Sequence, residues 1–477
     1  MPSSLIRQNN CPVIREEGVR LRQGYLKIFI IFFIASISLF AAVVSAENGV
    51  EIAADSIETY TLERSVERAL DVNPRMKATA SELRKADADI SMRRGDYFPT
   101  LSAQSYLERI NSLYLKGTED PDYMDQQVAG VTFRLSQPLF AGMTIYNTHQ
   151  KSLLSKERVE AWQKQQENEL ILEIQLYFLE LLKAREDVKS LRDSVSRLEM
   201  GVEAAEAFHE RRLAPYTHVL QAHVDLADAR QQLSQAENVV DTTRVRLNII
   251  LGFSAHRDIH YIGTLEKREQ WAKTFDECLD FAYANRPEIK VGQKGIELAE
   301  KDKKISLGRF LPRLNATVDY HIRDTDYDET STNIFGQVID RDRRNEYWTA
   351  GIRLQWELGL GGQQYHQYSR AAHEMQLLRH NLDETRNRVT AEVRTYFMNL
   401  REAEGRIDTM ATAVNHAHEG YDMAQQRFNV RMGTISELLD AQARLSRAEA
   451  GYNQAIADYL SSKARLYHAM GREEHSL

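Results

Sequence analysis

Apolar side chains recur at alternating spacings of four and three residues along two long stretches of the chain, one in each half. Five sustained heptads of this kind place an apolar seam on each helix and predict coiled-coil packing. The first helix extends from about 143 to 212, a rod of roughly 100 Å at 1.5 Å per residue. The seam positions are Leu170, Ile174, Tyr177, Leu181, Ala184, Val188, Leu191, Val195, Leu198, Val202 and Ala205, then Val389, Val393, Tyr396, Leu400, Ala403, Ile407, Met410, Val414, Ala417, Tyr421 and Ala424.

A partner helix is predicted after each long helix, because large and small apolar residues alternate there at the same spacing. Small residues at every second seam position let neighbouring helices approach closely. The connecting segments, "RRLAPYT" and "VRMGTIS", contain Pro215 and Gly433, which indicates tight turns between antiparallel helices. Shorter helices of about 20 residues are predicted at 75–94 and 288–307. We expect each to stack end to end with a partner helix beside the long helix.

Two segments have the period-two alternation that is typical of strands. The pattern is clear in "VTFRLSQPL", "LNATVDYHI" and "IRLQWEL", and weaker in "LSAQSYL". It predicts β-hairpins at about 96–141 and 309–360, with polar loops at 105–130 and 323–346. One apolar and one polar face would also suit a half-buried sheet of a soluble protein.

The rest of the chain favours a membrane sheet instead, because nothing in it would cover a four-stranded apolar face. Four strands are too few for a transmembrane barrel, which needs about eight or more. Open strand edges are excluded from lipid. Several chains would therefore have to contribute strands to one barrel, and three chains would supply twelve.

The two halves repeat each other. "NPRMKA" at 73–78 matches "RPEIKV" at 286–291, and "FRLSQPLFAG" at 133–142 matches "IRLQWELGLG" at 352–361. The offset between the halves grows from 213 to 219 residues, so six residues are inserted between 314 and 352. A pattern repeated at a long period indicates repeated structural units. We divide the chain into repeats at 75–252 and 287–471, a linker at 253–286 and a tail at 472–477.

Residues 1–46 have the features of a secretory signal peptide: basic residues, an apolar run, and "VSA" ending at Ala46. An uncleaved membrane anchor is the alternative. The chain has 61 Lys and Arg against 69 Asp and Glu; without the five basic and two acidic residues of 1–46, the net charge is 56 − 67 = −11. This charge argues against nucleic acid as a partner. Cys11 lies in the signal peptide, which leaves Cys278 without a disulfide partner.

The blocks "NP…FPTL…QPLFAG" and "RP…FLPRL…WELGLGG", the coiled-coil halves and "RMGTISELLDAQ" resemble the TolC-type outer-membrane efflux protein family, over essentially all of 60–471. The resemblance implies an α+β membrane protein: a homotrimer with a twelve-stranded outer-membrane barrel above a periplasmic coiled-coil tunnel. It implies a collar near 253–275 and a periplasmic location for 47–74. It also implies an exit duct that works with a periplasmic adaptor (a membrane fusion protein) and an inner-membrane transporter of the ABC or resistance–nodulation–division type.

The resemblance places the closed periplasmic end at the helix turns 208–218 and 427–437. Acids at the family's aperture positions are Glu437 and Asp440, and the gate aromatic is Phe428. The first-half counterparts of the two acids are His218 and Gln221. The plain alternative is that the acids are solvated first-turn residues, which suit a helix N-terminus. The adaptor-docking tips would be Arg212, Leu213, Ala214 and Pro215, with Arg431, Met432, Gly433 and Thr434.

No catalytic or metal-binding motif is found, so we expect neither an enzyme nor a cofactor. His366, His373 and His380 recur every seven residues, about 10 Å apart on a helix, too far for one metal ion. The main alternative to the duct is a periplasmic coiled-coil scaffold without a pore. Drug efflux and protein secretion cannot be separated, and metal-ion efflux is less favoured. An acidic, polar lumen is expected in each case.

Overall fold

The computed structural model describes residues 59–115, 121–266, 271–327, 331–332, 338–339, 343–430 and 432–471. The predicted signal peptide, the segment 47–58, the tail 472–477 and Arg431 lie outside the described residues. The chain divides into two units, 1–57 and 58–477. All elements below belong to the second unit.

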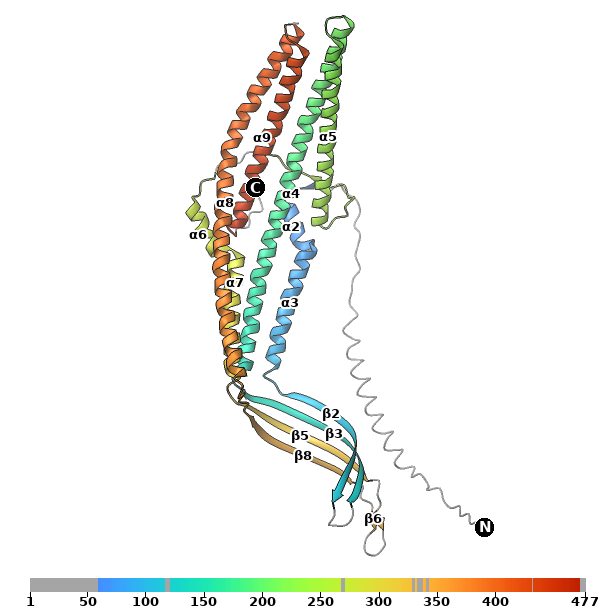
Figure 1. Cartoon of the computed structure of the whole chain (residues 1–477), viewed down its shortest axis with the longest axis vertical. Helices are drawn as coiled ribbons and strands as arrows, with labels where there is room; N and C mark the ends of the chain where they lie inside the picture. The colour runs from blue at the N-terminus through green and yellow to red at the C-terminus, as the bar shows by residue number, and fades with distance from the viewer. Residues whose placement is uncertain are drawn as a thin grey trace, which may run out of the picture. The chain divides into compact units, whose positions relative to one another are not determined.

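The two predicted long helices are present and have equal length. Helix α4 covers Thr144–Glu210 and α8 covers Gln363–Asn429, each with 67 residues. The partner helices α5, Tyr216–Ile250, and α9, Ile435–Ala469, have 35 residues each. The short helices α3, Pro74–Gly95, and α7, Pro287–Gly308, have 22 residues each. Figure 1 shows α3 and α7 at the end of the helices near the strands, and α5 and α9 at the opposite end.

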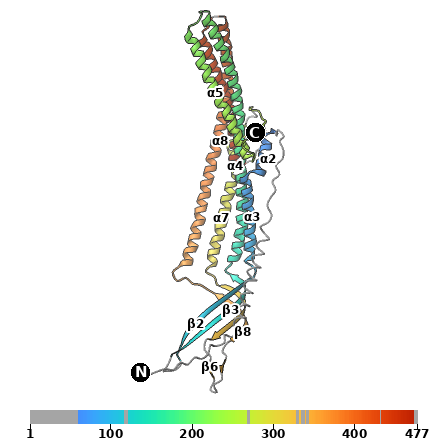
Figure 2. The same cartoon turned by 90° about the vertical axis from the view of Figure 1, so that its right-hand side faces the viewer.

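The long helices hold the helical part together, because α4 packs against helices of both halves. Helices α3 and α5 contact α4, helices α7 and α9 contact α8, and α4 also contacts α7 and α9 (Figure 2). Ion pairs reinforce two of these contacts: Lys156 Nζ lies 2.8 Å from Asp87 Oδ1 on α3, and Lys151 Nζ lies 2.7 Å from Asp302 Oδ1 on α7. The heptad prediction is confirmed, since no seam position of α4 or α8 is exposed.

The buried residues form two hydrophobic clusters along the helices. The larger cluster lies where α2, α6 and the linker wrap the long helices, and it includes Ile174, Val389 and Tyr459. The smaller cluster, here called the tip cluster, lies near the helix turns and includes Leu198, Ala222 and Phe428. Each cluster contains residues from both halves, so packing between the halves stabilises both regions.

Two further helices lie in segments for which no helix was predicted. Helix α2, Leu62–Val72, and helix α6, Phe275–Asn285, have 11 residues each. Helix α6 begins with a capping box, in which Thr274 and Glu277 bond each other's backbone N–H groups. Strand β1, Thr59–Tyr60, pairs in parallel with β4, His260–Tyr261. The linker 253–286 is therefore partly structured and is joined to the segment that precedes α2.

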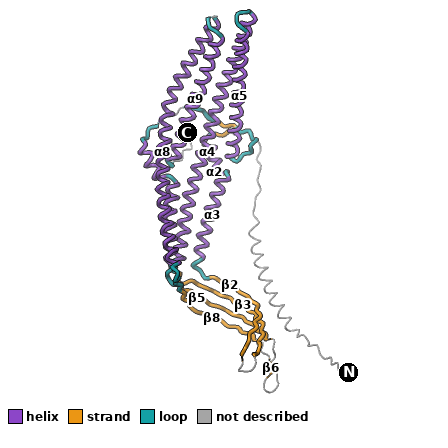
Figure 3. Tube along the Cα trace, viewed as in Figure 1, coloured by secondary structure: helices purple, strands orange, loops and turns teal. Residues whose placement is uncertain are grey.

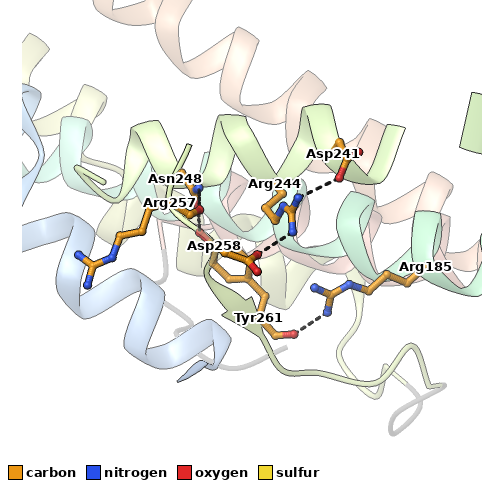
Figure 4. A network of polar contacts seen from close by, with 7 residues as sticks. All are labelled: Arg185, Asp241, Arg244, Asn248, Arg257, Asp258 and Tyr261. Carbon is orange, nitrogen blue, oxygen red and sulfur yellow. Dashed lines mark hydrogen bonds and ion pairs between the residues drawn. The ribbon is translucent and has the colours of Figure 1, made fainter. Parts of the chain in front are cut away.

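A polar network secures the linker to the long helix α4 and its partner helix α5 (Figure 4). Arg185 on α4 donates to the carbonyl oxygen of Tyr261 at 2.5 Å, and the Tyr261 hydroxyl donates to Asn248 Oδ1 on α5 at 2.7 Å. Arg244 on α5 bonds Asp258 in the linker at 2.8 Å. Burial raises the pKa of the Tyr261 hydroxyl, so this group remains a donor at neutral pH. We call Arg185, Arg244, Asn248, Asp258 and Tyr261 the collar network.

The four long strands form one antiparallel sheet with the order β2–β3–β5–β8 (Figure 3). The strands are β2, Thr100–Leu115; β3, Pro121–Ala141; β5, Arg313–Tyr327; and β8, Arg343–Gln355. A short hairpin, β6 at Ser331–Thr332 with β7 at Val338–Ile339, lies between β5 and β8. None of the described helices contains an apolar stretch long enough to cross a membrane.

The registers of the three strand pairs place the apolar residues of all four strands on one face. Leu101, Leu135, Val318 and Ala350 lie in one cross-strand row, and Ala103, Phe133, Tyr320 and Trp348 lie in the next. In the half of the sheet nearer the helices, most polar residues occupy the other face, on which Arg134 and Asp319 are directly opposite each other. Towards the far end, charged residues such as Arg109 and Arg344 also lie on the apolar face. The period-two alternation is thus confirmed for the segments in which it was predicted. The prediction of polar loops at 105–130 and 323–346 is wrong for much of both stretches, because the ladder of β2 and β3 continues to Leu115 opposite Pro121 and β5 continues to Tyr327.

Candidate gate and docking tips

The first tip is the turn between α4 and α5, and backbone hydrogen bonds fix its shape. The N–H of Leu213 donates to Phe208 O at 2.9 Å and the N–H of Arg212 donates to His209 O at 2.8 Å. These two bonds are the Schellman pattern of a helix C-terminus. Arg212 occupies the left-handed position with φ of 57°, where glycine is the usual residue. Pro215 is the N-cap residue of α5. Leu213, in the turn itself, is 55% exposed.

The second tip joins α8 to α9 and has a stronger N-cap. Thr434 Oγ1 accepts from the N–H of Glu437 at 3.2 Å, and the N–H of Met432 donates to Arg427 O at 2.7 Å. Gly433 is closely packed, because an added Cβ would lie 3.2 Å from Arg427 Cβ and 3.3 Å from Phe428 N, so these neighbours would have to shift by a few tenths of an ångström. Of the eight predicted tip residues, Arg431 lies outside the described residues, and the other seven are at the two turns.

Phe428 lies at the tip as predicted, but its ring is packed inside the chain. It is 7% exposed and meets Phe208 of α4 edge to face, with ring centroids 5.1 Å apart. Phe208 and Phe428 belong to different halves, so this pair joins the two helix pairs at their ends. An aromatic pair of this geometry contributes about 0.5–1.5 kcal/mol beyond its buried area. Its place at the aperture stays a prediction.

The predicted acids are exposed near the second tip. Glu437 Oε2 lies 3.7 Å from an Arg427 nitrogen on α8. Asp440 faces α5, where it interacts with Asp225. Burial raises the pKa of Asp225, and the charges of Asp228 and Asp440 raise it further, against a hydrogen bond from Gln221 that lowers it. Asp225 was not predicted.

The predicted His218 is half-buried in the first turn of α5, where its backbone N–H donates to Pro215 O at 3.1 Å. The structure gives its side chain no bond to Glu437 or Asp440. A histidine–carboxylate pair does occur nearby: His223 Nε2 lies 3.0 Å from Glu206 Oε1, between α5 and α4. The sequence offered no signal for this pair, because the two residues lie on different helices.

A polar contact between α4 and α9 lies further along the helices from the turns. Arg197 donates to Gln442 Oε1 at 2.8 Å and to Glu449 Oε2 at 3.4 Å. Gln442 also donates to Ser194 Oγ at 3.1 Å. Burial raises the pKa of the Glu449 carboxyl, although Arg197 acts against this. The set, here called the α4–α9 polar seam, joins the halves through residues that sequence reasoning missed, because no local pattern pairs them.

The outer face of α5 near its tip has an exposed apolar stripe, in which Tyr216 meets the His209 ring with centroids 5.2 Å apart. Tyr216, Leu220 and Val224 recur every four residues and are 57%, 49% and 55% exposed. At the matching positions of α9, Ile435 and Leu439 are only 4% and 7% exposed. The two halves repeat in sequence but differ in what covers them.

No group of three His, Cys, Asp or Glu side chains that could hold a metal ion is present in the part of the chain that the structure describes. His366 and His373 are both on α8, and His373 bonds Gln376 Oε1 at 3.2 Å. Cys278 is buried on α6, and burial raises the pKa of its thiol. A buried thiol of this kind is unreactive.

Comparisons with known proteins agree with this architecture. The model of the outer membrane efflux protein family matches residues 65–253 and 279–472. The chain is 23% identical over 356 residues to the alkaline protease secretion protein AprF of Pseudomonas aeruginosa, covering 73% of this chain and 70% of AprF. It is 20% identical over 452 residues to the outer membrane protein TolC of Vibrio cholerae, covering 93% and 95%.

A solved structure shares the fold. The CmeC outer membrane channel of Campylobacter jejuni aligns with a TM-score of 0.70 at 16% identity, over 90% of this chain and 94% of that one. Because the family model covers both halves, the chain belongs to the outer membrane efflux protein family and is an outer-membrane protein with a large periplasmic helical portion.

Proposed function

We propose that three copies of this chain form an exit duct in the outer membrane. The duct passively conducts substrates from an inner-membrane pump and a periplasmic adaptor to the exterior, and it is gated at the two tips. The observation that carries the proposal is the sheet: it has one apolar face, one polar face and two edge strands, β2 and β8, with no further partner among the described residues.

The apolar face is exposed in the single chain and suits contact with lipid. Leu101 is 73% exposed, Trp348 70% and Ile352 69%. Open edges are not tolerated in lipid, so β2 of one copy would pair with β8 of the next. Four strands from each of three copies make a closed barrel of twelve, within the range of outer-membrane barrels.

Exposed aromatic residues at the helix end of the sheet support this placement. They are Phe98, Phe140, Phe310 and Trp356, and Trp356 Nε1 donates to Phe310 O at 3.0 Å. Outer-membrane barrels carry aromatic girdles at both interfaces. Trp348 on β8 lies eight residues before Trp356, which directly follows the end of the strand, so extended chain between them spans about 27 Å. That separation suits the apolar band of about 25 Å once the strands tilt.

The helices would form the periplasmic tunnel below the barrel, with each chain supplying two structural repeats. The equal lengths of α4 and α8, α5 and α9, and α3 and α7 support this division. The apolar stripe of Tyr216, Leu220 and Val224 on α5 would pack against a neighbouring copy. Helix α8 of that copy is a suitable partner, because α9 already packs against α4 within one chain.

The gate would lie at the tips, where Glu437 and Asp440 would ring the axis and the turns would meet the adaptor. Three copies bring six of these carboxylates together, and Asp225 adds to the acidic end. A ring of acids favours cations and can be bridged by them. The relative AprF is named as a protease secretion protein. We therefore include protein export in the proposal, with an inner-membrane pump of the ABC type. A pump of the resistance–nodulation–division type is the other candidate.

Light scattering with detergent subtracted tests the assembly on material extracted from the outer membrane. A protein mass of three mature chains, together with ion conductance in planar bilayers, would support the duct. A monomer that is soluble without detergent would contradict it, because the apolar face would then never meet lipid.

A further inference from the structure

The polar face of the sheet carries an excess of positive charge, although the chain as a whole is acidic. Among the described side chains, this face has five arginines against Glu108 and Asp319, so its net charge is 5 − 2 = +3 per chain. The arginines are Arg134, Arg313, Arg323, Arg343 and Arg353. The acidic lumen that was expected for an export duct is therefore not what this face presents.

The strand registers show that the arginines follow one another along the sheet. Arg313 lies opposite Gln355 at the helix end, Arg353 lies opposite Asn315 in the next row, and Arg323 lies opposite Asn345 further along. Arg343 lies opposite Thr325, twelve residues along β5 from Arg313. At 3.3–3.4 Å per residue, the arginines cover about 40 Å of strand.

Only one of the five arginines is neutralised by a carboxylate among the described residues. Arg134 forms a two-point ion pair with Asp319, with distances of 2.7 and 3.3 Å. Glu108 shares a row with Arg343 but is separated from it by β3 and β5, about 14 Å at the usual strand spacing. Arg313 and Arg353 are exposed and have no ion pair in the described part of the chain.

We propose that this basic face lines the barrel section of the duct and makes it an attractive path for anionic substrates. The inference rests on the proposed duct, because the apolar face must meet lipid for the arginines to face water. Counting the described side chains alone, three copies would place nine net positive charges around one lumen. Low-dielectric walls focus such a field and raise the local concentration of anions. Arginine also binds carboxylate and phosphate groups through paired donors, so the substrate class is an anionic molecule or an acidic protein segment.

The test uses full-length trimer in planar bilayers, with inositol hexakisphosphate as a polyanion probe added on the strand side. We expect a current block from this side that weakens as salt is raised, because salt screens exposed charges. Arg313→Gln with Arg353→Gln removes six charges from the lumen and should weaken the block about tenfold or more. The matched control, Arg109→Gln with Arg344→Gln, removes as many charges from the apolar face at the far end of the sheet and should leave the block unchanged.

The outcomes separate the two proposals. No conductance from correctly assembled trimer would contradict the duct, and the inference would fall with it. Normal conductance without a sided block, or a block that both variant pairs weaken equally, would overturn the inference alone. Lipid phosphates are the other source of the same anion chemistry, so the block is repeated with anionic lipid in the bilayer. A block that anionic lipid abolishes would place the arginines against lipid and would also overturn it.

Discussion

The ring contact between Phe208 and Phe428 predicts that one substitution at the tip loosens both halves of the chain. Phe428→Ala removes a ring that is 7% exposed and leaves a cavity in the tip cluster. Substitutions of this kind cost about 3–5 kcal/mol. The cost should appear as local opening, because the tip cluster is separate from the larger cluster around the collar.

Hydrogen exchange of the trimer in detergent, read by mass spectrometry, measures this opening. Since about 1.4 kcal/mol corresponds to a tenfold change, exchange should accelerate by roughly 100-fold to 4000-fold. The acceleration should affect 421–440 and also 205–222, since Phe208 is on α4. Residues near Ile174, in the other cluster, should exchange as before.

Two control substitutions test whether the faster exchange comes from loss of the Phe428 ring. Met432→Ala truncates a side chain at the same tip that is 74% exposed, and it should change local stability by no more than about 0.5 kcal/mol. Phe428→Leu retains most of the apolar volume and should give an intermediate rate. Accelerated exchange in 421–440 with none in 205–222 would refute the reasoning, because Phe428 would then stabilise only its own half.

Three further predictions concern the gate, assembly and pH. Glu437→Ala with Asp440→Ala should raise single-channel conductance by loosening the closed end; unchanged conductance would remove both acids from the gate. Val195→Asp places an unpaired charge on a buried seam position, at a cost of several kcal/mol. The variant should therefore prevent assembly, and a normal yield of trimer on size exclusion would argue against the heptad assignment. The pKa of Asp225 is raised in the folded chain, so its ionisation destabilises the tip as pH rises above the unfolded value of about 4. Asp225→Asn should therefore slow local exchange at pH 7 and have little effect near pH 4, and an equal effect at both pH values would contradict the assignment.

Local sequence patterns were sufficient for the long, partner and short helices and for the helix-side part of the strands, but they did not predict α2 or α6. The 4,3 spacing identifies which side of α4 is covered, as Leu181 at 0% exposure shows. Period-two alternation identifies the two faces of β5, where Val318 and Asp319 point to opposite sides. Both predictions succeed because the geometry of a helix or a strand sets the direction of each side chain from its position alone. The capping box at Thr274 and Glu277 was also readable from sequence, and it would have revealed α6.

Contacts between the halves were decided only by the tertiary structure. Leu220 and Leu439 occupy matching positions in the repeat, yet the first is exposed and the second is buried. Arg197 meets Gln442 across 245 residues, and Asp440 reaches Asp225 from another helix. The physical reason is that a periodic pattern determines which face of an element is apolar, whereas the neighbour of that face depends on how the elements pack. The sequence by itself therefore determined the coiled-coil helices, the amphipathic part of the strands and the family resemblance. The packing of α4 against α9 decided which tip residues are buried, paired or free to meet another molecule.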